Sequence, residues 1–180
     1  LNSGQWTVAG GVVTYNNGNS LALTGIETLT GGAGNDVVTF TTASDVALTA
    51  TGALGGFNLT VSAFAGEFHN IDSLIGSAQN DSFTGLNAPA TFDLQPASVE
   101  YTSSGESLTI SVFETITGGT GVDEIIFGVA ADVTLTGIGA LGGFDLTQAS
   151  YTGEFQNIDA LTGKALTTNS FTGLNASATF

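Results

Sequence analysis

Apolar and polar residues alternate along many short runs of this chain. Residues 46–49, 57–61 and 107–112 read VALT, FNLTV and SLTISV, with a period of two. That period is typical of strands with one buried face. No stretch sustains the i, i+3, i+4, i+7 apolar spacing of a helix, and Gly, Thr and Ser interrupt every segment. The chain is therefore predicted to be all-β.

A long repeat is superimposed on this alternation. Residues 31–39, GGAGNDVVT, return 87 positions later as residues 118–126, GGTGVDEII. The same offset places residues 53–57 on 140–144 and 66–68 on 153–155. Trp6, Phe92 and Phe180 follow similar segments and mark the boundaries. We therefore expect residues 1–5 to end a preceding repeat, 6–91 and 92–179 to be two solenoid repeats, and residue 180 to start the next.

A finer repeat divides each of these units. One acidic motif occurs four times, and four further strand starts fall between its copies. The acids are Glu27, Asp72, Glu114 and Asp159, and the strand starts are Trp6, Val46, Phe92 and Val133. These eight positions divide the chain into units of about twenty residues, the size of one solenoid coil. The prediction is a right-handed parallel β-solenoid, or β-helix, of about eight coils in two 87-residue repeats.

Expectations for individual side chains follow from a solenoid. Phe57, Phe68 and Phe83 should stack in its core, with Thr, Ser and Asn outside. The glycines at positions 31, 32, 34, 55 and 56 should occupy corners that need positive φ.

Charge is scarce and one-sided. The chain has 16 acidic residues against one Lys, Lys164, and no Arg, for a net charge of −15. Nucleic acid and anionic membranes need clustered Lys or Arg, so neither is an expected partner. There is no Cys for a disulfide, and no apolar run approaches the roughly 18 residues of a membrane span. The lack of Met and of a visible signal peptide suggests a piece of a longer protein.

The repeated nonapeptide fits the G-G-x-G-x-D-x-U-x pattern of calcium-binding β-rolls. It makes Asp36 and Asp123 candidate calcium ligands. In such rolls an ion lies between consecutive nonapeptide turns, whereas these two copies are isolated, and a related acid, Asp81, becomes Asn169 in the second repeat. A turn carboxylate that caps backbone N–H groups is the alternative, so no cofactor is expected to be required for folding.

Catalytic residues are not prominent. The one His, His69, is replaced by Gln156 in the second repeat. Glu67 and Asp72 could form a carboxylate pair, but both recur as Glu154 and Asp159, and an enzyme rarely duplicates its active site along a repeat. The four motif acids are expected to form a solvated stripe. The chain is therefore predicted not to be an enzyme.

The runs GIETLTGGAGND (25–36) and NIDSL (70–74), with the WTV opening at residues 6–8, resemble repeats of giant bacterial surface proteins. These are filamentous-haemagglutinin-like or type I-secreted adhesins with degenerate haemagglutinin-type calcium-binding repeats. The resemblance covers the whole chain and implies a secreted β-solenoid, extracellular or on the bacterial cell surface, used as a stalk or filament.

Three functions follow from these patterns. The first is a structural module of an adhesin stalk or self-assembling filament, whose partners are further repeats of the same chain or identical copies stacked end to end. The second is a surface that binds ice or a host or surface glycan through outward threonines, namely Thr49, Thr60, Thr134 and Thr147. The third is a polysaccharide-acting β-helix enzyme.

Overall fold

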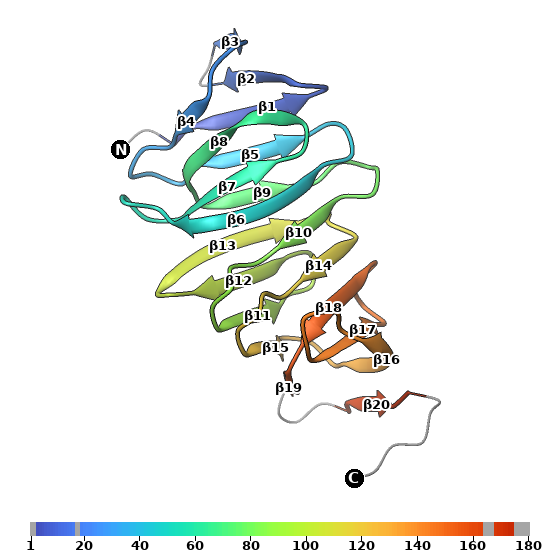
Figure 1. Cartoon of the computed structure of the whole chain (residues 1–180). Coiled ribbons are helices and arrows are strands. Elements are labelled where there is room, and N and C mark those ends of the chain that lie inside the picture. Colours follow the sequence, from blue (N-terminus) through green and yellow to red (C-terminus); the bar gives the residue numbers. More distant parts are fainter. Residues whose placement is uncertain (1–2, 17–18, 164–167, 175–180) are drawn as a thin grey trace.

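The fold is all-β, as predicted. The structure is a computed structural model that describes residues 3–16, 19–163 and 168–174. These residues form twenty strands and contain no helix, so none of them offers a helix that could cross a membrane. The strands make two ten-stranded sheets in a β-solenoid arrangement of about four turns (Figure 1).

Within each sheet, every strand is hydrogen-bonded to the next one in space. In that spatial order, sheet A consists of β19 (Ala160–Thr162), β15 (Asp123–Phe127), β11 (Ala90–Leu94), β12 (Val99–Ser103), β13 (Glu106–Ser111), β9 (Ser73–Ile75), β5 (Val37–Phe40), β1 (Gln5–Ala9), β2 (Val12–Asn16) and β3 (Ser20–Leu23). Sheet B consists of β20 (Ser170–Thr172), β16 (Asp132–Ile138), β17 (Phe144–Gln148), β18 (Glu154–Ile158), β14 (Thr115–Thr117), β10 (Ser82–Thr84), β6 (Asp45–Thr51), β7 (Phe57–Val61), β8 (Phe64–Ile71) and β4 (Thr28–Thr30).

The chain alternates between the two sheets in a fixed order. A meander of three antiparallel strands in sheet A, β1–β3, is followed by single strands in B and A. A meander in sheet B, β6–β8, is followed by single strands in A and B. The strands β11 to β20 then follow the same order.

Parallel and antiparallel pairing occur together, which the sequence did not indicate. Among the described strands, ten neighbouring pairs are parallel and eight, all within meanders, are antiparallel. Residues paired between parallel strands are 32 to 39 positions apart in the sequence. The smallest separation is that of Gln5 and Val37, and the largest is found, for example, between Thr28 and Glu67. The prediction of eight coils is not confirmed, because a unit of about twenty residues covers only part of a turn.

The meanders run backwards along the axis of the solenoid. After β10 the chain skips ahead to β11, and β12 and β13 then return, so that β13 pairs with β9. The next strand in sheet A, β15, pairs with the other edge of β11. The meanders β6–β8, β11–β13 and β16–β18 each fill a gap that the chain left open, so neighbouring turns interlock, whereas β3 of the first meander is an edge strand (Figure 1).

The hydrophobic core lies between the two sheets. Inward and outward residues alternate along the strands, and the three phenylalanines predicted to be internal, Phe57, Phe68 and Phe83, are fully buried. Tyr101 packs edge-to-face on both Phe57 and Phe83, with ring centroids 5.4 Å apart in each pair. Each such buried side chain stabilises the fold by about 1.5–3 kcal/mol, so the core supplies most of the favourable free energy.

The glycine prediction is correct at only some positions. Gly55 and Gly56 have φ of 111° and 62°, a conformation that strongly favours glycine. The glycines at positions 31, 32 and 34 do not have positive φ. At Gly31 the reason for glycine is close packing, because a β-carbon there would lie 2.5 Å from the carbonyl oxygen of Asn70.

Candidate functional site

Three buried aspartates form a series along the solenoid. Asp36, Asp81 and Asp123 are at most 1% exposed, and they lie at the starts of the single strands β5, β10 and β15. Asp36 and Asp123 come from the two nonapeptides, and Asp81 from the related segment that lacks the full pattern. The structure therefore gives all three the same kind of position.

Two of the three aspartates, Asp36 and Asp81, cap backbone groups of the preceding turn. Oδ1 of Asp36 accepts a hydrogen bond from the N–H of Gly4, just before β1. Oδ1 of Asp81 accepts the N–H of Ser44 at 2.7 Å, just before β6. Because strand ends carry N–H groups that their own sheet leaves unpaired, a side-chain oxygen at this position replaces a missing ladder bond.

Asn169 performs the same task with a neutral side chain. Its Oδ1 accepts the N–H of Ala131 at 3.0 Å, just before β16. The replacement of Asp81 by Asn169 between the repeats is therefore compatible with capping, for which one carbonyl-type oxygen suffices.

Asp123 has the least favourable surroundings of the buried carboxylates. Among the described residues, neither of its side-chain oxygens has a hydrogen-bond partner, whereas Asp36 leaves only Oδ2 unpaired. Burial, followed by the negative charge of Asp159, raises the pKa of Asp123 to about 6. The backbone N–H groups of Gly119 and Ala90 lower the pKa of Asp123, but by less than burial and Asp159 raise it.

The motif acids bond to the buried aspartates through the backbone. Side-chain oxygens of Asp72, Glu114 and Asp159 accept the N–H groups of Asp36, Asp81 and Asp123 at 2.8, 2.7 and 2.9 Å. In return, the N–H groups of the three motif acids donate to the backbone carbonyls of the same aspartates.

The prediction of a solvated stripe therefore has to be corrected for two of the four acids, since only Glu27 and Asp159 are exposed. Asp72 and Glu114 are half-buried capping residues, and Asp159 has the same backbone role although it is exposed. Burial, followed by repulsion from Asp36 and Glu106, raises the pKa of Asp72.

These carboxylates do not converge on a common point. In residues 3–16, 19–163 and 168–174, no three His, Asp or Glu side chains lie close enough together to hold a metal ion. Calcium takes about six to eight oxygen ligands. A β-carbon at Gly31 would lie 2.6 Å from Oδ2 of Asp36, and one at Gly118 would lie 2.5 Å from Oδ2 of Asp123, so glycine backbone packs directly on both carboxylates. The surroundings suit a buried cap better than a hydrated cation, and calcium at Asp36 and Asp123 stays a prediction.

The carboxylates considered for catalysis have separate partners. Glu67 accepts a hydrogen bond from the hydroxyl of Thr49 at 2.7 Å and contacts Nε2 of His69 at 2.9 Å, and these two contacts lower the pKa of Glu67. Glu154 has matching contacts with Thr136 and Gln156. Since glutamine takes the place of His69, a titrating side chain is not needed for this arrangement.

The four threonines proposed for ice or glycan binding do not form one row. Thr134 lies opposite Thr147 on β16 and β17, whereas Thr60 on β7 lies opposite Ala47 and Glu67. Thr49 sits at a register shift in β6. Three strands, β18, β14 and β10, separate the two groups in sheet B.

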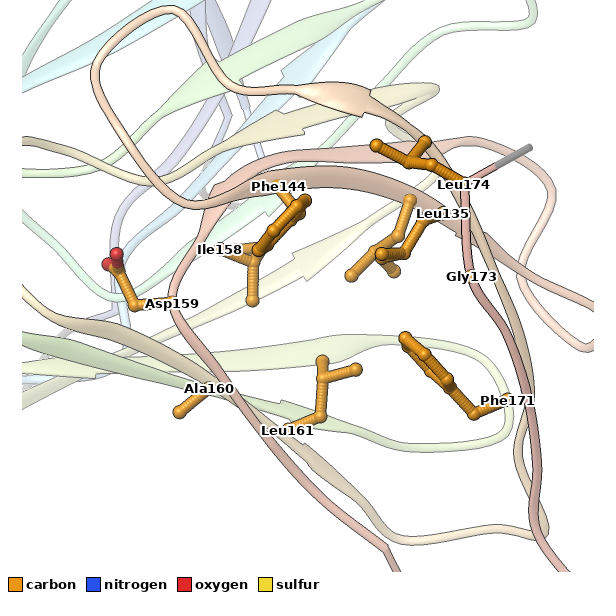
Figure 2. Close-up of a pocket in the computed structure, with 10 residues that line it drawn as sticks. Leu135, Phe144, Ile158, Asp159, Ala160, Leu161, Phe171, Gly173 and Leu174 are labelled. Carbon is orange, nitrogen blue, oxygen red and sulfur yellow. The ribbon is translucent and has the colours of Figure 1, made fainter. Parts of the chain in front are cut away.

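An apolar pocket lies at the C-terminal end of the core. It has a volume of about 460 Å³, and its walls come from β16, β17, β18, β19 and β20. Phe144 and Phe171 face the space from opposite sides, with Leu135 and Leu161 between them (Figure 2). The sequence did not indicate this pocket, because it depends on which strand is last in each sheet.

Comparisons of the chain with protein-family models, curated proteins and solved structures found no match.

Proposed function

We propose that this chain is a structural module of an extracellular bacterial adhesin stalk or self-assembling surface filament. The observation that carries the proposal is the recurrence of one strand order, with equivalent pairing and capping, in β1–β10 and β11–β20. Such modules stack in one dimension and bury a continuous core. Two 87-residue repeats, wound as a right-handed solenoid, are the units of this proposal.

Matching polar contacts support the repeat. Asn70 and Asn157 are 87 positions apart, and both have a φ of 56°. Oδ1 of Asn70 accepts the N–H of Leu54 at 3.3 Å, and Oδ1 of Asn157 accepts the N–H of Leu141 at 3.1 Å. A conformation that is uncommon for a non-glycine residue recurs with the same bonds, which is expected of a true structural repeat.

The charge distribution fits a role outside the cell among like copies. A net charge of −15 opposes unspecific sideways association of neighbouring rods and disfavours nucleic acid. It leaves the outer edges of β3, β4, β19 and β20, which pair on one side only among the described strands, as the places for assembly. The proposed partners are further repeats or identical copies, and a host or surface glycan is a secondary candidate.

Immunogold electron microscopy of intact source cells tests this function. Antibodies raised against the folded chain should label extracellular filaments or the cell surface. Label confined to the cell interior would contradict the proposal. Turnover of any glycan in a polysaccharide panel would favour the enzyme instead, and thermal hysteresis would favour ice binding.

A further inference from the structure

The two ends of the solenoid expose different strands. At the N-terminal end, β3 is the edge of sheet A and β4 the edge of sheet B. At the C-terminal end the corresponding edges are β19 and β20 (Figure 1). Backbone groups on such edges are templates for pairing with another strand.

The middle of the molecule shows how equivalent strands pair. There β13 pairs with β9 in parallel, and β14 pairs with β10 in parallel. In the repeat, β3 and β4 are the counterparts of β13 and β14, and β19 and β20 are those of β9 and β10. The two ends therefore carry the two halves of a joint that is already formed inside the chain.

Side-chain exposure identifies what this joint covers. Phe57 and Phe83 are fully buried in the middle, whereas their counterparts Phe144 and Phe171 are 42% and 57% exposed at the C-terminal end. Leu108 in β13 is fully buried, and its counterpart in β3, Leu21, is 60% exposed. The apolar residues exposed at both ends are thus ones that the internal joint buries.

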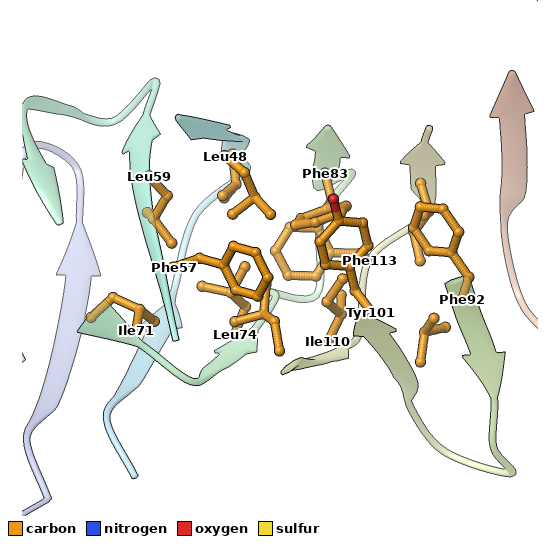
Figure 3. Close-up of a cluster of buried hydrophobic side chains, with 14 of the residues drawn as sticks. Leu48, Phe57, Leu59, Ile71, Leu74, Phe83, Phe92, Tyr101, Ile110 and Phe113 are labelled. Carbon is orange, nitrogen blue, oxygen red and sulfur yellow. The ribbon is translucent and has the colours of Figure 1, made fainter. Parts of the chain in front are cut away.

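A tyrosine fills the internal joint. Tyr101 lies between Phe57 and Phe83, and its hydroxyl accepts the N–H of Leu86 at 2.9 Å (Figure 3). Gly85 makes room for the ring, since a β-carbon there would lie 3.0 Å from it. The contact combines aromatic packing with a satisfied polar tip.

The C-terminal pocket has the same walls without the tyrosine. Phe144, Phe171, Gly173 and Leu174 line it, and they are the counterparts of Phe57, Phe83, Gly85 and Leu86. Figure 2 shows Phe144 and Phe171 on opposite sides of the space that corresponds to the position of Tyr101.

The counterpart of the tyrosine itself is at the opposite end of the chain. Tyr15 in β2 packs against Trp6 with ring centroids 5.6 Å apart, as Tyr101 packs against Phe92 at 5.1 Å. Tyr15 is half-buried, so part of its ring is still exposed.

We propose that the pocket receives Tyr15 of a second copy of this chain, with β3 of that copy pairing with β19 and β4 pairing with β20. This interface deepens the proposed function and rests on it. The internal joint fixes the register. Within one chain, Thr109 pairs with Ser73 and Ile110 with Leu74. Between two copies, the counterparts Ala22 and Leu23 of one copy would therefore pair with Ala160 and Leu161 of the other. In sheet B, Leu29 of one copy would pair with Phe171 of the other, as Ile116 pairs with Phe83 within the chain.

The replacement of Asp81 by Asn169 in the second repeat favours the contact between copies. In the internal joint, Glu114 accepts the backbone N–H of Asp81, so two acidic residues are in direct contact. In the joint between copies, Glu27 takes the place of Glu114 and Asn169 that of Asp81. The joint between copies therefore carries one negative charge fewer, which lowers the repulsion between the two copies.

Sedimentation velocity of the chain over a range of concentrations tests the joint. The wild type should form dimers and longer head-to-tail species. Gly173→Val, which fills the pocket, should weaken association at least tenfold. A β-carbon at Gly173 would have only a ring atom of Phe171, at 4.0 Å, in contact, so this variant should fold.

Two further variants complete the sedimentation series. Tyr15→Ala should weaken association to a similar extent as the pocket variant. Leu141→Ser is the matched control, because Leu141 and its counterpart Leu54 are 53% and 60% exposed at positions that the joint does not cover. Circular dichroism checks that each variant is folded.

Chemical cross-linking tests the register. The chain contains no cysteine, so Ala22→Cys chains mixed with Ala160→Cys chains should give a covalent dimer with a short bismaleimide. Ala22→Cys mixed with Ser170→Cys, whose sites belong to different sheets, should give much less.

Several results would overturn the joint. They are a monomeric wild type at the highest concentration, association that Gly173→Val leaves unchanged, or equal cross-linking of both cysteine pairs. A monomeric chain together with surface label in immunogold microscopy would reject this joint and leave the stalk function standing. Association of the chain with label only inside the cell would reject the stalk function instead.

Discussion

Replacing Asp123 by Asn should stabilise the protein at neutral pH. Asp123 is fully buried, and its carboxylate oxygens have no hydrogen-bond partner in the part of the chain that the structure describes. Its pKa rises from the usual 3.8 to about 6, chiefly because of burial and secondarily because of the charge of Asp159. The folded protein therefore binds a proton at this site more tightly than the unfolded chain does.

The direction of the pH dependence follows from that difference. Below about pH 4 the carboxyl is neutral in both states, and its titration costs no stability. Between about pH 4 and pH 6 the unfolded chain loses the proton first, so the free energy of unfolding decreases as the pH rises. Two pKa units correspond to about 3 kcal/mol at pH 7, which is an upper limit for the cost of this buried charge.

Asp123→Asn removes the charge at every pH. We expect the variant to gain up to about 3 kcal/mol at pH 7 and almost nothing at pH 4. Urea denaturation from pH 4 to pH 8 in excess chelator measures this, with fluorescence of the buried Trp6 as the probe. A variant less stable than the wild type at pH 7 in chelator would refute the reasoning.

Asp81→Asn is the matched control, and it should have the opposite effect. Oδ1 of Asp81 accepts the N–H of Ser44, and its Oδ2 accepts both the N–H and the hydroxyl of Ser77, at 2.6 and 2.8 Å. An amide nitrogen cannot accept these bonds, so the variant should lose about 1–3 kcal/mol at neutral pH. Repeating both titrations in calcium tests ligation. A calcium-dependent gain of the wild type that Asp123→Asn abolishes would assign the residue to a metal site.

Four further predictions concern the backbone and calcium. Gly56→Ala should lower stability by more than about 2 kcal/mol, because its φ is 62° and a β-carbon would lie 2.4 Å from the carbonyl oxygen of Ile71. Gly10→Ala, with a φ of 54° and open space around it, should cost only about 1 kcal/mol in the same thermal melts. Val112→Gly should raise the melting temperature slightly, because this β-branched residue has a φ of 60° where its counterpart Gly25 has 66°, and an unchanged or lower temperature would argue against strain there. Adding a chelator to the wild type should shift the melting temperature little, and a loss of many degrees that calcium restores would show that calcium supports folding.

The sequence by itself determined the fold class and the inward-facing residues. Its period of two predicted strands with one buried face, and Phe57, Phe68 and Phe83 are indeed buried. The repeat of 87 residues also identified Asp36 and Asp123 as equivalent positions, and the structure buries both at the start of a single strand.

Only the tertiary structure decided which strands are neighbours and in which direction they run. Alternation specifies the face on which a side chain lies, but β12 antiparallel to β13 and β13 parallel to β9 require the same alternation. The raised pKa of Asp123 and the pocket beside Phe171 are likewise invisible in the sequence. They arise because β19 and β11 flank β15, which begins with the buried Asp123, while β20 is the last described strand of sheet B, so that no described strand covers Phe171 on its outer side.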